Sequence, residues 1–147
     1  MSDLLSDLQS AIVARLKDEA TDIEDLDIVN AADTDAMRQI ETALNGDGVV
    51  AIVVSPDLAF DDVDEVTATC QVRVREKWMQ NRSKGGTNVA GSAHAMHIAA
   101  WLQRAELDEI WSPLKIESVA ELEATEEIFE WAVTLHTRAQ TFSETET

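Results

Sequence analysis

Three histidines are the side chains best suited by type to metal binding or catalysis in this sequence of 147 residues. His94 and His97 stand three positions apart, a spacing that places two imidazoles on one face of a helix, and His136 could supply a third ligand. No Asp or Glu lies within that segment to complete a HExxH-like zinc site. The pattern favours hydrogen-bonded histidines at a packing interface, and a metal-dependent enzyme is the alternative.

Other candidate groups lack the arrangement that a reaction requires. Cys70 has no histidine near it in the sequence, so we expect a small core residue rather than a nucleophile. Segment 83–87 contains lysine and two glycines without the spacing of a phosphate-binding loop, and the acidic clusters at 22–27 and 61–65 lack the spacing of a calcium loop. We therefore expect no enzymatic activity, no cofactor and no resident metal.

The net charge of −18 is unevenly distributed along the chain. Residues 1–65 carry a net charge of −14, residues 66–105 carry +5 and residues 106–147 carry −9. This excess of acid opposes binding to nucleic acid and to anionic membranes, so neither is an expected partner. Opposite charges in separate parts of one molecule favour head-to-tail contacts between copies that close into a ring, although neutralisation within one subunit would explain the same pattern.

The positive charge is concentrated in one short stretch, which is followed by possible aromatic anchors. Trp78 and Trp111 stand where secondary-structure elements should end. They could be partly exposed anchors for a partner, because aromatic residues are frequent at the centres of interfaces. The predicted subunit or partner interface consists of Arg73, Arg75, Lys77, Trp78, Arg82, Lys84 and Trp111.

Hydrophobic periodicity predicts the elements that position these residues. Alternation from Val66 to Arg75 is typical of a long strand with one buried face, and the apolar run from Val49 to Val54 is typical of a strand buried on both faces. Asp33 or Thr34 should cap the second helix, which should stop at Asn45-Gly46. The expected elements are helices at about 3–18, 36–44 and 88–104, an edge strand at 26–29, strands at 49–54, 66–75, 114–117 and 128–136, a loop at 79–88 and a turn at 120–124.

This order of elements predicts a single α+β domain over residues 1–138. Its sheet should be mixed or mostly antiparallel, with about four strands and two main helices packed on one face. Residues 139–147 are expected to form a mobile, acidic C-terminal tail. The start of the sequence lacks the basic and apolar regions of a signal peptide, so a cytoplasmic location is expected.

The middle of the chain resembles a pattern in the tail terminator proteins of tailed bacteriophages and prophages, also called tail completion or tail-to-head joining proteins. A long strand ends in a V-x-E motif at Val74-Arg75-Glu76, Asn81-Arg82 and a Gly-Gly pair follow, and then an alanine-rich helix at 90–102. The order of the flanking elements agrees over most of the chain. The acidic stretch at 18–35 departs from the family pattern.

This resemblance implies a structural protein without enzymatic activity. It implies a ring, commonly of six copies, that caps the tail tube, ends tail polymerisation and offers the head a matching surface. The implied partners are further copies of the chain, a tail tube protein and a head–tail connector protein. The implied location is the host bacterial cytoplasm before assembly and the virion tail afterwards.

An acidic DNA mimic is the alternative function that composition supports. Such an inhibitor would occupy a basic nucleic-acid-binding partner through its negative surface, which the net charge of −18 favours. The basic segment within 66–105 opposes a uniformly negative surface.

Overall fold

The computed structural model describes residues 4–20, 26–62, 65–81 and 90–140 of the chain. In sequence order its elements are α1 (Leu4–Glu19), β1 (Asp27–Asn30), α2 (Ala36–Gly46), β2 (Val49–Val53), β3 (Asp57–Asp62), β4 (Glu65–Lys77), α3 (Trp78–Asn81), α4 (Gly91–Leu102), β5 (Lys115–Ala124) and β6 (Ile128–Gln140). No helix among these residues is both long and apolar enough to cross a membrane.

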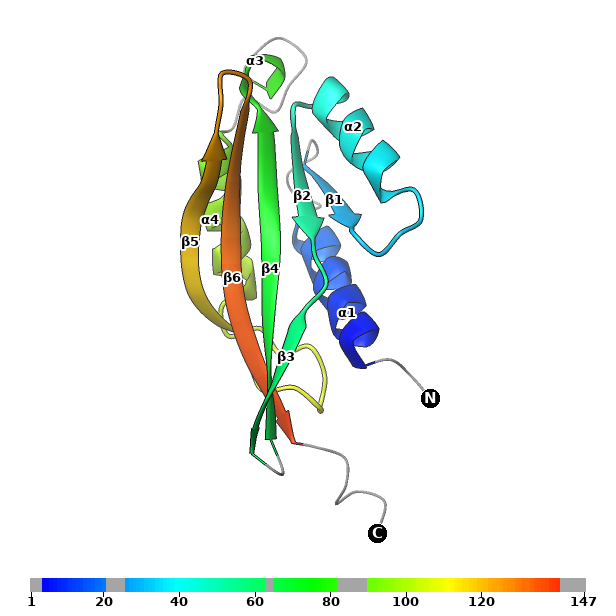
Figure 1. Cartoon of the computed structure of the whole chain (residues 1–147), viewed down its shortest axis with the longest axis vertical. Coiled ribbons are helices and arrows are strands. Elements are labelled where there is room, and N and C mark those ends of the chain that lie inside the picture. The colour runs from blue at the N-terminus through cyan, green and yellow to red at the C-terminus, as the bar shows by residue number, and fades with distance from the viewer. Residues whose placement is uncertain (1–3, 21–25, 63–64, 82–89, 141–147) are drawn as a thin grey trace.

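Strand β4 forms the centre of a mixed six-stranded sheet (Figure 1). One of its edges pairs with antiparallel β6 along the whole strand, from Glu65 opposite Gln140 to Lys77 opposite Ile128. Its other edge pairs first with β3 and then with β2. The strand order is β1-β2-β4-β6-β5, with β3 beside β4, and only the β1–β2 pair is parallel. The prediction of a mixed, mostly antiparallel sheet is confirmed.

The main core lies between the sheet and helices α1 and α4. Strict alternation along β4 buries every second side chain, and these face the apolar sides of the two helices. Removing this apolar surface from water is the main favourable term in folding. The side chains at the centre of this core include Leu8, Ile12, Leu16, Val49, Ala51, Cys70, Val72, Val74, Ile98 and Leu102.

A second, smaller core lies on the opposite face of the sheet, where α2 packs. Ile40 and Ala43 of this helix contact the cluster formed with Val50 and Ile52 of β2. All five residues of β2 are therefore buried, as the continuous apolar run predicts. The prediction that the two main helices, α1 and α4, pack on one face is confirmed. The shorter α2 covers the other face, because the outward side chains of β2 also need an apolar cover.

Within the described residues, the sheet has six strands rather than about four, and four helices are present. Strand β1 lies at the sheet edge, where the edge strand at 26–29 was expected. The unexpected strand is β3, whose three aspartates suggested a solvated acidic segment. Pairing with β4 satisfies the backbone hydrogen-bonding groups of β3, and the polar sequence of β3 gives no sign of this pairing.

Strand β5 is longer than expected, and its turn comes later. It runs from Lys115 to Ala124, so the predicted turn at 120–124 is wrong, and Thr125 instead begins the turn into β6. Two register shifts, between Ile116 and Ser118 and between Glu121 and Glu123, interrupt the alternation that would have shown the full strand.

The last strand also extends past the expected end of the domain. Strand β6 continues to Gln140, so Ala139 and Gln140 belong to the sheet rather than to a tail. The remainder of the predicted tail, residues 141–147, lies outside the described residues.

Helix α2 begins without the side-chain cap that the sequence suggested. Its N-cap is Asp35, which makes no capping hydrogen bond, so the assignment of the cap to Asp33 or Thr34 is wrong. The carboxylates of Asp33 and Asp35 instead accept hydrogen bonds from Nε2 of Gln39, at 3.2 and 2.7 Å. These contacts hold the first turn of the helix through a glutamine.

Replacement of Gly48 by alanine is expected to lower the free energy of unfolding by about 2 kcal/mol or more. Gly48 has a φ of +85°, and a Cβ there would lie 2.2 Å from the backbone nitrogen of Asn81. The matched control is Gly46→Ala, because a Cβ at Gly46 meets nothing within 4 Å. Urea unfolding of both variants checks this, and equal midpoints would contradict the steric argument.

Candidate functional site

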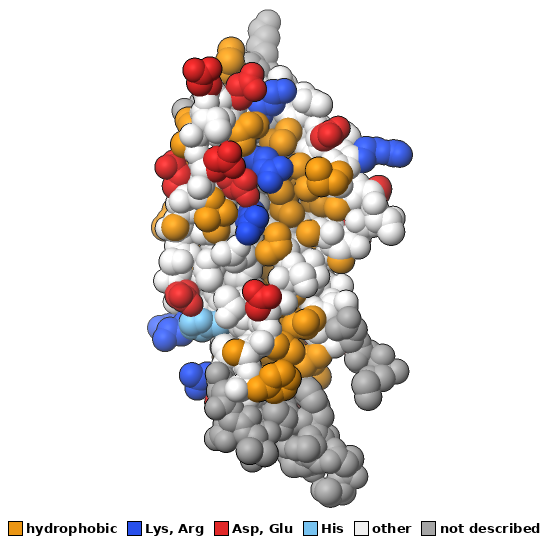
Figure 2. Space-filling model, viewed as in Figure 1, with side chains coloured by type: hydrophobic (Ala, Val, Ile, Leu, Met, Phe, Trp, Pro, Cys, Tyr) orange, Lys and Arg blue, Asp and Glu red, His pale blue; other side chains and the backbone are white. Residues whose placement is uncertain are grey.

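The predicted basic residues of β4 lie together on the face of the sheet that α1 and α4 leave open. Alternation places Arg73, Arg75 and Lys77 on this face, opposite to the buried valines of the same strand. We call these three residues the basic strand face. Figure 2 shows Lys and Arg side chains in the upper middle of this view, with acidic and hydrophobic side chains around them.

Each member of the basic strand face makes a polar contact within its own subunit. Nε and Nη2 of Arg75 both lie 3.3 Å from Oε1 of Glu130, the residue directly opposite on β6. Arg73 donates from Nε to Oε1 of Gln71 at 3.2 Å, and Lys77 donates from Nζ to Oδ1 of Asn45 at 3.2 Å. Of these three, only Arg75 meets a carboxylate among the described residues, so intramolecular neutralisation accounts for part of the positive charge.

The other predicted interface residues have different positions. Arg82 and Lys84 lie outside the described residues. Trp78 is half-buried, and its Nε1 donates to the carbonyl oxygen of Glu126 at 2.7 Å, which ties the start of α3 to the β5–β6 turn. The interface role of these residues stays a prediction.

The expected exposure of Trp111 is wrong. The side chain is only 4% exposed and belongs to the main core. The turn that precedes it explains this placement, because Oδ1 of Asp108 accepts hydrogen bonds from the backbone N–H groups of Ile110 and Trp111. The turn leaves Ile110 exposed and Trp111 buried, so the aromatic side chain serves the subunit's own core.

A buried carboxylate at the end of β4 is a feature that sequence reasoning missed. The side chain of Glu76 is fully buried, Oε2 accepts a hydrogen bond from Nδ2 of Asn81 at 2.6 Å, and Oε1 accepts one from the backbone N–H of Gly91 at 3.1 Å. Buried carboxylates are tolerated when such charge-assisted bonds replace water. The sequence could have predicted this burial, because alternation places Glu76 on the same face as Val72 and Val74.

This carboxylate joins two parts of the chain at the end of β4. Asn81 ends α3, and Gly91 begins α4. Because Glu76 binds both, Asn81 and Gly91 are held together at the end of β4, next to Lys77 and Trp78.

The histidines do not form a metal centre within the described part of the chain. His94 is buried and His97 is exposed, with its imidazole centre 6.0 Å from the ring centre of Trp101, and His136 lies 3.0 Å from Glu117. The described residues hold no group of three or more His, Cys, Asp or Glu side chains that could bind a metal ion. Burial, followed by the charge of His97, lowers the pKa of His94 to about 4.

The single cysteine is likewise unsuited to nucleophilic chemistry. Cys70 is 1% exposed in the main core, on the buried face that alternation predicted. Burial, followed by the charge of Asp57, raises the pKa of the Cys70 thiol to about 12. The thiolate is the reactive form of cysteine, so this side chain is inert at neutral pH.

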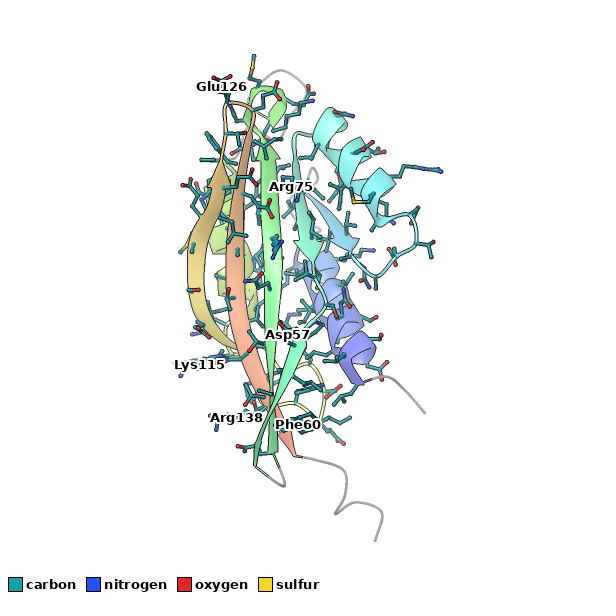
Figure 3. All side chains as sticks on the ribbon, in the orientation of Figure 1. Asp57, Phe60, Arg75, Lys115, Glu126 and Arg138 are labelled. Atoms are coloured by element: carbon teal, nitrogen blue, oxygen red, sulfur yellow. The ribbon has the colours of Figure 1, made fainter. Side chains whose placement is uncertain are left out.

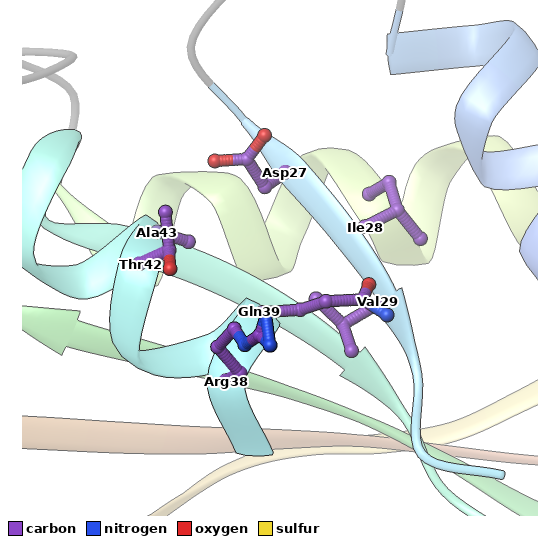
Figure 4. Close-up of a pocket in the computed structure, with 7 residues that line it drawn as sticks. All are labelled: Asp27, Ile28, Val29, Arg38, Gln39, Thr42 and Ala43. Carbon is purple, nitrogen blue, oxygen red and sulfur yellow. The ribbon is translucent and has the colours of Figure 1, made fainter. Parts of the chain in front are cut away.

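One hollow of about 290 Å³ lies between β1 and α2 (Figure 4). Its polar lining includes one carboxylate, one guanidinium, an amide and a hydroxyl, but no histidine or cysteine that could act with them. The lining residues are Asp27, Ile28, Val29, Arg38, Gln39, Thr42 and Ala43. This set does not form a catalytic constellation.

Comparisons with known proteins place the fold but not the family. No protein-family model matches the chain, and no curated protein matches it significantly. Among solved structures, the fold is similar to a chain from the virion of a native gene transfer agent particle, with a TM-score of 0.60 and 12% sequence identity. The match covers 95% of this chain and 100% of that chain. The α+β architecture is therefore shared over the whole domain.

Replacement of Glu76 by glutamine is expected to lower the free energy of unfolding by about 1–3 kcal/mol, because the amide cannot accept from both donors. Exchange of the Gly91 amide hydrogen should accelerate with it. Glu123→Gln on exposed β5 is the control and should change stability by less than about 0.5 kcal/mol. Urea unfolding and hydrogen exchange test this, and an unchanged Gly91 exchange rate would remove the role given to Glu76.

His94 is expected to stay neutral in the folded protein until the pH approaches its lowered pKa of about 4. The unfolded chain takes up this proton near the ordinary pKa of 6.5, so folded stability should fall as the pH drops from 6.5 towards 4. NMR titration of the imidazole nitrogens checks the pKa. A His94→Gln variant should lose less stability over that interval, and a titration of His94 near pH 6.5 would contradict the burial argument.

Proposed function

We propose that this protein is a structural subunit of a phage-like virion. The observation that carries the proposal is the similarity of fold to a virion chain over nearly the full length of both chains. The inert Cys70 and the absence of a metal-binding group among the described residues agree with a non-enzymatic role.

The more specific proposal is a tail terminator, in agreement with the V-x-E, Asn-Arg and Gly-Gly motif. In this role, copies of the chain form a ring, of six subunits in the family pattern, on the last ring of the tail tube. The ring stops the addition of further tube subunits by covering their binding surface, and its other side meets the head–tail connector. The protein then passes from the bacterial cytoplasm into the virion tail.

The structure offers a physical basis for this geometric mechanism. Arg73, Arg75 and Lys77 share one face of β4, and Glu76 joins Asn81 to Gly91 at the end of this strand. A surface held in place before binding loses less entropy when a subunit binds its neighbour. The same basic residues oppose the DNA-mimic alternative, which requires a continuous negative surface.

The ring makes a testable prediction for the purified full-length chain. Light scattering coupled to size-exclusion chromatography should show a closed oligomer of fixed size, and added tail tube protein from the same genome should form tubes that stop growing at one end. The control is tube growth without this chain. Tubes of unchanged length, together with a monomeric chain at every concentration, would contradict the terminator proposal.

A further inference from the structure

The β5–β6 hairpin carries opposite charges at its two ends. Four exposed acids lie near the turn, and we call them the acidic tip: Glu121, Glu123, Glu126 and Glu127. Three exposed bases lie at the other end, and we call them the basic base: Arg104, Lys115 and Arg138. Figure 3 shows Glu126 at one end of the hairpin, and Lys115 and Arg138 towards the other.

Backbone contacts bring the members of the basic base together. Lys115 and His136 are register partners at the start of β5, and the N–H of Arg104 donates to the carbonyl oxygen of Leu114 at 2.8 Å. Arg138 lies two residues beyond His136 on β6. Three segments that are distant in the sequence therefore place positive charge at one sheet corner, which no local pattern could indicate.

This positive charge is only partly met by acids of the same subunit. Nη1 of Arg138 lies 3.8 Å from Oε1 of Glu65, and both side chains are largely exposed, which makes the pair weak. Nearby Glu117 is occupied by His136, and Glu109 lines the same hollow as Arg138. Lys115 and Arg104 form no ion pair with any described residue.

The acidic tip of the same subunit is too far away to neutralise the basic base. Eight residues separate Lys115 from Glu123, and a strand rises about 3.3 Å per residue, which gives roughly 26 Å. Charges in physiological salt are screened over about 8 Å. The acidic tip and the basic base of one subunit therefore do not neutralise each other, and both are free to meet opposite charge on another copy.

Two features favour a contact through side chains rather than through paired backbones. Strand β5 lies at the sheet edge, and its two register shifts and its charged side chains hinder pairing with another strand. The acids and bases themselves remain exposed. We propose that the acidic tip of one copy contacts the basic base of the next copy, head to tail, and so forms the repeated contact of an assembly of this chain.

The inference rests on the proposed assembly and names the surface that carries it. A head-to-tail contact uses two different patches on each subunit, and it closes into a ring when the rotation between neighbours allows. Exposed ion pairs are individually weak, so the contact needs several of them and should weaken as salt increases.

A charge-swap experiment tests the contact. Glu121→Lys with Glu123→Lys changes the charge of the acidic tip from −4 to 0, and Lys115→Glu with Arg138→Glu changes that of the basic base from +3 to −1. We call these the tip variant and the base variant, and each is expected to self-associate at least about tenfold more weakly than the wild type. The decisive sample is the fourfold variant, because its neutral tip no longer repels the negative base. If tip and base touch, the fourfold variant should associate more tightly than the base variant, whereas independent effects would make it the weakest of all.

Matched controls separate a specific contact from a change in net charge. The first control, Glu41→Lys with Asp47→Lys, adds as much positive charge as the changes in the acidic tip. The second, Lys17→Glu with Arg38→Glu, adds as much negative charge as the changes in the basic base. Both lie away from the hairpin, so they should assemble like the wild type apart from a small uniform shift. Circular dichroism verifies folding, and mass photometry from 50 to 500 mM salt measures assembly.

The outcomes distinguish this inference from the function it rests on. A fourfold variant that associates more tightly than the base variant supports the contact. Hairpin variants that match their controls, or a fourfold variant weaker than the base variant, overturn it. If the wild type still assembles in that case, the ring forms through another surface. A wild type that stays monomeric throughout contradicts the ring and this contact together.

Discussion

The uninterrupted pairing of β4 with β6 is the constraint on which the rest of the structure depends. Because β6 pairs with all thirteen residues of β4, each β4 side chain has a fixed face. A slip by one residue would move Arg75 into the apolar core and expose the valines. The Arg75–Glu130 pair and the bonds of Glu76 stabilise the register from opposite faces of the same strand.

The end of β4 shows how that register organises the elements around it. Glu76 binds Asn81 and Gly91, while Gly48 lies so close to Asn81 that a side chain would not fit. Gly91 is equally confined, because a Cβ there would lie 2.5 Å from Trp131. Two glycines and one buried carboxylate thus hold α3, α4 and β2 together at the end of β4 that carries Lys77 and Trp78.

Sequence patterns predicted those parts of the fold that depend on local periodicity. The two faces of β4, the burial of β2 and the inward position of Cys70 follow from alternation or from a continuous apolar run, and the structure confirms them. Periodicity cannot say which face of the sheet a helix covers, so the position of α2 on the second face could not be predicted. Strand β3 is too acidic, and β5 too irregular because of its register shifts, to show a strand pattern.

The candidate site, too, could be predicted from the sequence only in part. The common face of Arg73, Arg75 and Lys77 could be predicted from spacing, but the partner of Arg75 depends on the β4–β6 register, which lies in no single segment. Trp111 was misjudged because a position between elements does not reveal whether the chain turns inwards. The basic base was not anticipated, since its residues come from three separate segments.

The placement of Cys70 has a consequence for the durability of any assembly of this chain. It is the only cysteine, it is enclosed by the core, and its raised pKa keeps the sulfur protonated. Disulfide cross-links between copies therefore cannot form while the fold is intact. An assembly of such subunits would keep the same bonds between its copies in reducing and in air-saturated surroundings, as far as its cysteines are concerned.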